Sequence, residues 1–379
     1  MIDPHTHLRD WNQAYKETVK HGLEVAYRAS LDAVFEMPNT SPAITSRQTI
    51  EDRLKLADEA IAELKKEHKG FHIWHGLYAG VTADPEQIKE IVEVYNEHRK
   101  TDKRVVGLKM FAGQSTGNMG IIEEIDQIKV YETLAKLNYR GVLAVHCEKE
   151  SLIKKKPDGS QDWDPSNPYT HASARPAVSE LDSVRDQATF SSSAGFKGTL
   201  HVCHVSVPEA VRYIYQNRHG LNITCGATPH HCTLNAESMQ GKEGLLKKMN
   251  PPLRSGSSPI VMRQEVMFGD VTWIESDHAY HTLDEKSGKA VDKKERPIFA
   301  SGIPVFPFYP RFIKMLREKG ISEARLDDIT HNNILAVFGL TADLIPNTKR
   351  AGIQSEKELQ ALEKEYEFNA FAKSECVWV

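Results

Sequence analysis

Cysteine and long hydrophobic runs are scarce in this sequence of 379 residues. It contains five cysteines, none of them in a CxxC pair, and no apolar run approaches the ~20 residues needed to cross a bilayer. So few cysteines cannot cross-link a chain of this length, which excludes a disulfide-stabilised secreted scaffold and indicates a reducing compartment. The N-terminal sequence MIDPHTHLRD also lacks the basic and apolar regions of a signal peptide. We therefore expect a cytoplasmic protein without membrane contact.

An excess of either charge is also missing. The 48 Lys and Arg residues nearly balance the 52 Asp and Glu residues, and neither sign is gathered into a long block. Nucleic acids and anionic membranes are bound by basic patches, so neither is expected as a partner. The 40% of hydrophobic and 26% of charged residues are typical of a folded globular protein. Histidine, by contrast, is abundant, with 17 residues.

Short β-branched or aromatic runs alternate with longer segments of helical apolar spacing, such as 46–68 and 84–100. Strands are predicted at 2–7, 31–38, 71–81, 104–111, 141–148, 198–206, 222–230 and 271–279. Eight strand and helix units predict an α/β fold, a (β/α)8 TIM barrel. An open doubly wound sheet is the alternative, but no GxGxxG turn follows the first strand.

Two long segments depart from this rhythm. Residues 151–180 and 280–310 are rich in proline, charge and turn formers, so we predict extended loops there, the first leading into a helix near 181–190. Both follow a strand, which in a barrel places them on the C-terminal face that carries catalysis. The division expected is a catalytic barrel at 1–345 and, at 346–379, a helix over 355–368 with a short tail packing on the barrel.

Polar side chains occur at or just beyond the C-terminal ends of the predicted strands. They are His5, His7, Lys109, His146, His204 and Asp277. A barrel brings these ends together around one axis, and His5 and His7, two apart on a strand, can offer two imidazoles to one cation. Alone, that pair also fits hydrogen-bonded structural histidines. The later histidines favour a metal, because burying many imidazoles without partners is costly.

Lys109 and Asp277 each fit two interpretations. Lys109 lies between apolar residues of a predicted strand and fits a lysine that extends to water. It equally fits an amine that burial neutralises and that reacts with carbon dioxide to give a carbamate able to bridge two cations. Asp277 fits a carboxylate ligand on the opposite wall or the N-cap of a helix after the last strand.

The order of short motifs along the chain is informative. The motifs are DPHTHLRD (3–10), MPNTSP (37–42), GLKMFAG (107–113), HCE (146–148), HASARP (171–176), HVS (204–206), TPHH (228–231), NPPLR (250–254) and DHAYH (277–281). They resemble dihydroorotase, a cyclic amidohydrolase of the metal-dependent amidohydrolase superfamily. The arginine after HxHL, the PNT sequence and NPPLR narrow the resemblance from the superfamily to this family.

The resemblance implies two divalent metal ions, most often Zn2+, and a set of site residues. It assigns His5, His7 and Asp277 to one metal, and His146 and His204 to the other, with N6-carboxylated Lys109 as the bridge. It assigns Asp277 as the general acid and base. Arg9, Asn39 and His281 match positions that hold the substrate carboxylate and ring, and Asn250 matches a position that contacts the pyrimidine.

The implied reaction is the reversible cyclisation of N-carbamoyl-L-aspartate to L-dihydroorotate and water, a step of de novo pyrimidine (UMP) biosynthesis. A hydroxide shared by the two metals would attack the amide, and Asp277 would carry the proton to the leaving nitrogen. The implied partners are the small-molecule substrate and, as the family suggests, a second copy of the chain and an aspartate transcarbamoylase.

The sequence also departs from the family. Tyr280 replaces the usual proline of DHAPH, and residues 301–310, SGIPVFPFYP, differ from the usual glycine- and glutamate-containing segment. Few residues precede Asp3, so we expect the flanking β-sandwich of relatives to be absent or truncated.

Two alternative functions stay open. Another cyclic amidohydrolase (a dihydropyrimidinase, hydantoinase or allantoinase) would share the metal ligands, but Arg9 and Asn39 argue against it. An inactive scaffold for aspartate transcarbamoylase would usually have lost ligands, and all six candidate positions carry the expected residue types here.

Overall fold

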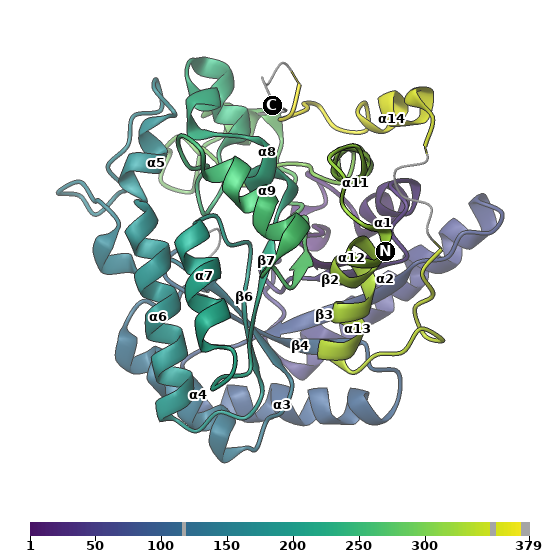
Figure 1. Cartoon of the computed structure of the whole chain (residues 1–379), viewed down its shortest axis with the longest axis vertical. Coiled ribbons are helices and arrows are strands. Elements are labelled where there is room, and N and C mark those ends of the chain that lie inside the picture. Colours follow the sequence, from purple (N-terminus) through teal and green to yellow (C-terminus); the bar gives the residue numbers. More distant parts are fainter. Residues whose placement is uncertain (116–118, 349–353, 373–379) are drawn as a thin grey trace.

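The computed structural model describes residues 1–115, 119–348 and 354–372. Within these residues, eight parallel strands form one sheet in chain order (Figure 1). The strands are β1 (Ile2–Thr6), β2 (Ala33–Glu36), β3 (Trp74–Gly80), β4 (Val105–Ala112), β5 (Val142–Cys147), β6 (Thr199–Val202), β7 (Ile223–Ala227) and β8 (Trp273–Ile274). Sequential order confirms the predicted barrel, because a doubly wound sheet reverses its strand order at a switch point.

The barrel is closed between its first and last strands at the C-terminal end. β8 is short, but the chain beyond it continues alongside β1, where Thr6 bridges His278 in parallel. The His7 amide donates to the His278 carbonyl at 2.7 Å, and the Asp277 amide donates to the His5 carbonyl at 3.0 Å. The HxH segment and the segment after β8 are therefore held side by side.

Helices connect the strands and cover the outside of the sheet (Figure 1). The two segments with helical apolar spacing, 46–68 and 84–100, form α2 and α3. Helix α2 has an N-terminal capping box at Ser46, and α3 has Asp84 as its N-cap. No helix in the described part of the chain is long and apolar enough to cross a membrane. The helices are α1 (Val19–Arg28), α2 (Arg47–Glu67), α3 (Pro85–Lys100), α4 (Glu124–Lys136), α5 (Thr170–Ala174), α6 (Ala177–Ser193), α7 (Pro208–Asn217), α8 (Pro229–Thr233), α9 (Ser258–Phe268), α10 (Leu283–Ser287), α11 (Tyr309–Glu318), α12 (Glu323–Asp327), α13 (Asn333–Phe338) and α14 (Glu356–Leu362).

The N-terminal end of the barrel is filled by aromatic side chains. Phe338, the last residue of α13, packs its ring 5.1 Å from Phe35, 6.1 Å from Tyr78 and 5.6 Å from Trp273, measured between centroids. Each of these side chains is at most 4% exposed. With that end closed by apolar packing, the polar side chains of the strands gather at the opposite end.

The two predicted extended loops contain more helix than expected. The segment 151–180 includes α5 and the first turn of α6, and 280–310 includes α10 and the start of α11. A capping box at Thr282 starts α10, a signal that the sequence interpretation overlooked.

The C-terminal helix α14 is shorter than the predicted 355–368. The chain leaves the helix and places Tyr366 beside His278, 5.3 Å between ring centroids, and Phe371 over Phe308 at 3.7 Å. Aromatic packing against the barrel therefore replaces the last helical turns. The expected short tail beyond residue 372 lies outside the described residues, and the division at residue 345 stays a prediction.

A buried ion pair joins the outer helix α2 to the end of β2, and the same arginine also bonds the loop after β1. Arg53 donates from Nε to both oxygens of Glu36 at 3.0 Å, and neither side chain is exposed to solvent. Its Nη2 also donates to the backbone carbonyls of Leu8 and Arg9. His75 completes the cluster, with Nε2 3.0 Å from Glu36. This arginine therefore holds the segment that carries Arg9.

Replacing Arg53 by methionine leaves the Glu36 carboxylate buried without its cation. We expect the free energy of unfolding, measured by urea denaturation, to fall by about 3–5 kcal/mol. Arg47→Met is the matched control on the same helix, because the Arg47 pair with Glu97 is exposed and contributes little. Equal losses in the two variants would contradict the importance assigned to the buried pair.

Candidate active site

A pocket opens at the C-terminal end of the barrel and collects most of the candidate residues. Two loops contribute further lining residues, Ser115 after β4 and Ser301 and Gly302 after β8. The candidate residues that line the pocket are His5, His7, Arg9, Asn39, His146, His204, Asn250 and Asp277. Lys109 and His281 are not among the residues that line this pocket.

The first cluster consists of His5, His7 and Asp277. The Nε2 atoms of the two histidines are 3.3 Å apart, and Oδ1 of Asp277 lies 3.4 Å from His5 Nε2 and 2.9 Å from His7 Nε2. Asn39 faces the other nitrogen of His7, with Oδ1 2.6 Å from Nδ1. Burial raises the pKa of Asp277, but the two histidines outweigh burial and hold that pKa below its usual range. Asp277 is therefore a carboxylate at neutral pH.

The hydrogen bonds around this cluster leave acceptor atoms facing one another. Asn39 Oδ1 can only accept, so His7 donates from Nδ1; in the neutral form of this ring, Nε2 would then carry the lone pair and meet Asp277 as a second acceptor. Two acceptors at this distance repel each other unless a cation lies between them. Ligand atoms ~2.0–2.1 Å from a tetrahedral zinc ion lie roughly 3.3 Å apart. The cluster has this spacing and fits a divalent cation.

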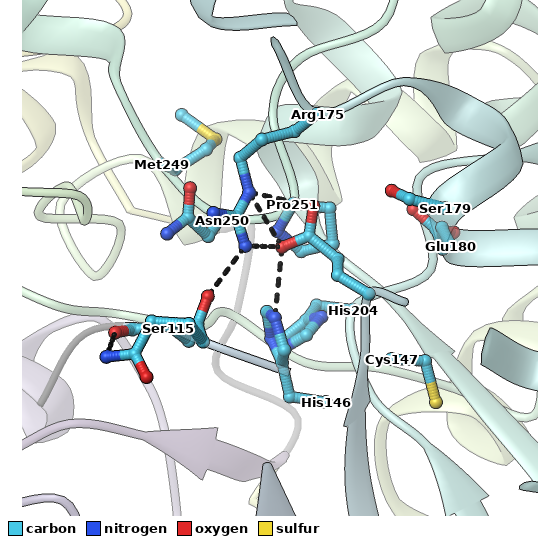
Figure 2. Close-up of polar contacts among 12 residues, drawn as sticks. Ser115, His146, Cys147, Arg175, Ser179, Glu180, His204, Met249, Asn250 and Pro251 are labelled. Carbon is cyan, nitrogen blue, oxygen red and sulfur yellow. Dashed lines mark hydrogen bonds and ion pairs between the residues drawn. The ribbon is translucent and has the colours of Figure 1, made fainter. Parts of the chain in front are cut away.

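The second cluster is the pair His146 and His204, which lie side by side in Figure 2. Nδ1 of His146 is 3.2 Å from Nε2 of His204. Nε2 of His146 contacts Oε2 of Glu148 at 3.0 Å, which directs Nδ1 toward the pocket. Arg175 donates to both oxygens of Glu148 and keeps that carboxylate charged in a fully buried position.

Lys109 lies between the two clusters and has no exposed surface. Its Nζ is 3.1 Å from Sγ of Cys203, the residue before His204. Burial lowers the pKa of His5 to about 4, and the proximity of Lys109 adds to this effect. Burial also lowers the pKa of His146, and Lys109 adds to that effect. The alternative of a lysine extending to water is therefore wrong, and the histidines are neutral imidazoles suited to ligating a metal.

Asp277 is not a helix cap. Helix α10 begins at Leu283 with Thr282 as its N-cap, five residues further along the chain. Asp277 instead adopts a positive φ of 50°, and the hydrogen bond from its backbone amide to the His5 carbonyl fixes its position. A positive φ is uncommon outside glycine, and here it turns the carboxylate toward the histidines.

The candidate substrate residues flank the first cluster. Arg9 is 2% exposed, and its Nη2 lies 3.2 Å from Nε2 of His281 while its Nε donates to the Tyr280 carbonyl at 3.3 Å. Asn250 lines another wall, with Oδ1 3.0 Å from His171 Nε2. The structure thus brings three of the predicted substrate residues, Arg9, Asn39 and Asn250, to the same pocket as the candidate ligands, and His281 contacts Arg9 from outside the lining.

Tyr280, which replaces the family's usual proline, fastens the C-terminal segment to the loop after β8. Its hydroxyl donates to Glu367 at 2.9 Å, and its ring lies 4.8 Å from that of Tyr366. The Tyr366 hydroxyl in turn donates to Glu17, which lies 3.4 Å from His278. The departure therefore leaves Asp277 in place and adds a packing contact next to it.

Several buried charged residues escaped the sequence interpretation. Glu36 and Glu275 sit in or next to apolar strands, and Glu148 directly follows one. A charged residue in or beside an apolar strand needs a partner in the folded protein. These three glutamates are therefore recognisable in the sequence by the same signal as Lys109. Arg254 of NPPLR was also missed as a connector: it donates to the Ser206 hydroxyl at 2.9 Å and to the Arg175 carbonyl at 2.6 Å.

Curated proteins similar to this chain are dihydroorotases. The dihydroorotase of Methanosarcina mazei is 30% identical over 357 residues, which cover 89% of this chain and 69% of that protein. The dihydroorotase of Methanosphaera stadtmanae is 28% identical over 80% of this chain and 62% of its own length. A Staphylococcus aureus dihydroorotase is 29% identical over 83% of this chain and 67% of its own length. This chain thus spans about two thirds of the length of these relatives. No protein-family model matches it.

Solved structures show the same fold at lower identity. L-hydantoinase (dihydropyrimidinase) from Arthrobacter aurescens has a TM-score of 0.71 and 21% identity, covering 89% of this chain and 70% of that one. Dihydroorotase from Saccharomyces cerevisiae, in complex with 5-fluoroorotic acid, has a TM-score of 0.67 and 14% identity, covering 91% and 85%. At these identities the likeness is one of fold, and it does not choose between substrates.

The two clusters predict two metal equivalents per chain. Zinc titration of chelator-treated protein, followed by elemental analysis, should give two equivalents for the wild type and fewer for His204→Asn, because the second cluster then keeps only His146. His331→Asn is the control: His331 is also buried but bonds the Ile345 carbonyl away from the pocket, so its zinc content should be unchanged. Equal zinc content in wild type and His204→Asn would exclude His204 as a ligand.

Proposed function

The chain belongs to the dihydroorotase family, and from this membership and the pocket we propose that it is a dihydroorotase. It would interconvert N-carbamoyl-L-aspartate and L-dihydroorotate with loss or gain of water, the ring-forming step of de novo pyrimidine biosynthesis. The observation that carries the proposal is one pocket that combines a cation-binding cluster with the buried guanidinium of Arg9.

Arg9 supports a substrate that carries a carboxylate. Its guanidinium presents a planar set of donors that matches a carboxylate bidentately, and water is largely excluded around it. Dihydroorotate has a carboxylate on its ring, whereas hydantoin and dihydrouracil do not. His281 lies within 3.2 Å of Arg9, and Asn250 lines the same pocket as Arg9. Arg9 would therefore bind the carboxylate while Asn250 contacts the ring.

Two divalent cations, most often zinc in this family, would be held by His5, His7 and Asp277 and by His146 and His204, with carboxylated Lys109 shared between them. When bound, they would supply Lewis acidity that polarises the amide carbonyl and makes water nucleophilic at neutral pH. The protein's own part is to keep the imidazoles neutral, which burial does by lowering the pKa of His5, His146 and His204.

Asp277 would move the proton. Its carboxylate is ionised at neutral pH and faces the pocket, so it can accept a proton from the attacking water. In hydrolysis it then donates that proton to the ring nitrogen as the amide bond breaks, and in cyclisation the same transfer runs in reverse. The positive φ of Asp277 and the hydrogen bond from its backbone amide to the His5 carbonyl fix the carboxylate for this transfer.

The intact constellation argues against an inactive scaffold. All six candidate ligand positions are buried, and the structure brings them together at one end of the barrel. A homodimer and an aspartate transcarbamoylase partner stay predictions of the family resemblance.

Asp277→Asn removes the proton acceptor but keeps the size of the side chain. We expect the rate of dihydroorotate hydrolysis to fall by roughly 10²–10⁴-fold with the fold intact and most zinc retained, measured by turnover, circular dichroism and elemental analysis. Asp284→Asn, in the exposed first turn of α10, is the control and should keep the wild-type rate. Activity within a few-fold of wild type in Asp277→Asn would refute the assigned role.

Arg9→Lys keeps the positive charge and removes the bidentate fork. The loss of a charged hydrogen bond, about 1.5–3 kcal/mol, corresponds to roughly a 10- to 150-fold lower kcat/KM for dihydroorotate, with zinc content unchanged. Arg311→Lys on the surface of α11 is the control. A panel of dihydroorotate, dihydrouracil, hydantoin and allantoin completes the test. Wild-type turnover of a neutral ring without turnover of dihydroorotate would make the chain another cyclic amidohydrolase.

A further inference from the structure

Glu275 is a fully buried carboxylate directly beneath the candidate ligands. It follows β8 by one residue and precedes Asp277 by two, and none of its surface is exposed. The mechanism proposed above does not use it. A buried charge in an otherwise apolar strand is costly unless its hydrogen bonds are complete, so its partners indicate what it does.

Both oxygens of Glu275 are engaged. Oε2 accepts from the indole Nε1 of Trp273 at 2.9 Å and lies 3.0 Å from Nε2 of His201. Oε1 accepts from the backbone amide of His204 and lies 3.5 Å from Nδ1 of His5. The indole and the amide can only donate, so the carboxylate is the acceptor. Three nitrogen groups thus hydrogen-bond this carboxylate, and the Nδ1 atom of His5, which has no hydrogen-bond partner of its own, lies beside Oε1.

The neighbouring strand is shaped to admit this side chain. Gly226 in β7 faces Glu275, and a Cβ built on Gly226 would lie 2.3 Å from the carboxyl carbon and 2.4 Å from Oε2. Any larger residue at position 226 would push the carboxylate away from His204 and His5. Thr224, also on β7, contacts Nδ1 of His201 at 3.0 Å and turns Nε2 of that ring toward the carboxylate.

We infer that Glu275 is a positioning residue for the metal centre, orienting one ligand of each cluster. Its Oε1 lies 3.5 Å from the unpartnered Nδ1 of His5, so a proton on Nδ1 would point to the carboxylate and the lone pair of Nε2 would face His7 and Asp277, 3.3 and 3.4 Å away. It also fixes the backbone of His204, whose φ of 39° is unusual for a residue with a side chain. This inference rests on the metal-binding part of the proposed function.

A separate cation site is the competing explanation. His201, Cys203 and Glu275 offer ligand atoms within 4.8 Å of one another. A cation there would have to displace the proton by which His201 bonds Glu275 and compete with the indole of Trp273 for the same oxygen. The three donors that already bond the carboxylate therefore favour positioning over ligation.

Glu275→Gln tests the inference because it keeps the shape and replaces one acceptor oxygen by a donor. We expect zinc affinity, measured by competition with a chromogenic chelator, to fall by roughly 10- to 100-fold, while thermal unfolding of the metal-free protein still shows a cooperative transition. Glu36→Gln is the matched control, a buried strand carboxylate that bonds Arg53 and His75 and no candidate ligand. It should lower stability and leave zinc affinity within a few-fold of wild type.

A crystal structure of the zinc-loaded wild type keeps the inference testable even where the variant does not fold. His5 should bind zinc through Nε2, with Nδ1 within hydrogen-bond distance of Glu275. Coordination through Nδ1, or a further zinc held by His201, Cys203 and Glu275, would overturn the inference. Unchanged zinc affinity in a folded Glu275→Gln would overturn it alone, whereas a wild type that binds no zinc would overturn the proposed function with it.

Discussion

The convergence of nitrogen and oxygen lone pairs at one end of the barrel is the constraint on which the rest of the site depends. A neutral imidazole has one donor and one acceptor, and whichever atom takes the proton decides where the lone pair points. In this structure a side-chain oxygen faces one nitrogen of three of the four candidate histidines. The pairs are Asn39 with His7, Glu148 with His146, and Glu275 with His5. The lone pairs are thus turned inward, toward one another, and a cation is the natural counterpart of such an arrangement.

Buried carboxylates need charged or hydrogen-bonding partners, and two of those near the pocket are paired with arginines. Glu148 is paired with Arg175, and the same arginine donates to the Gln114 carbonyl at 2.9 Å. Glu180 is paired with Arg254, which also holds the Arg175 carbonyl. Each arginine therefore does two things at once: it supplies the charge that a buried carboxylate needs, and it fixes a loop backbone at the rim of the pocket. Burial of a pair without such additional hydrogen bonds would not be favourable.

The sequence was sufficient for the barrel and for the residues of the pocket, and insufficient for what supports them. Strand and helix periodicity and the positions of His5, His146 and Asp277 at strand ends are local features, and the structure brings these residues together as expected. The partners of the histidines are set by contacts across the barrel. Glu275 and His201 are 74 residues apart, and only the closed sheet makes them neighbours. The role of Tyr280 was equally out of reach, because its hydroxyl bonds a residue 87 positions away. Short elements such as α5 could not be predicted for another reason, because five residues are too few to show a periodic pattern.

Under the proposed function, Asn39 links substrate choice to the metal centre. The fold is shared with a hydantoinase, so the fold by itself does not distinguish a charged from a neutral ring, and the choice depends on residues that contact the substrate. Arg9 and Asn39 are such residues, yet Asn39 also accepts from Nδ1 of His7 at 2.6 Å and so sets the direction of a ligand lone pair. A change at Asn39 would alter both the grip on the substrate and the orientation of His7. Arg9 has no such contact with a candidate ligand among its hydrogen bonds, which go to the Tyr280 carbonyl and His281. Substitution of Arg9 can therefore change selectivity for the substrate carboxylate without loss of the metal. Substitution of Asn39 would change both selectivity and metal binding.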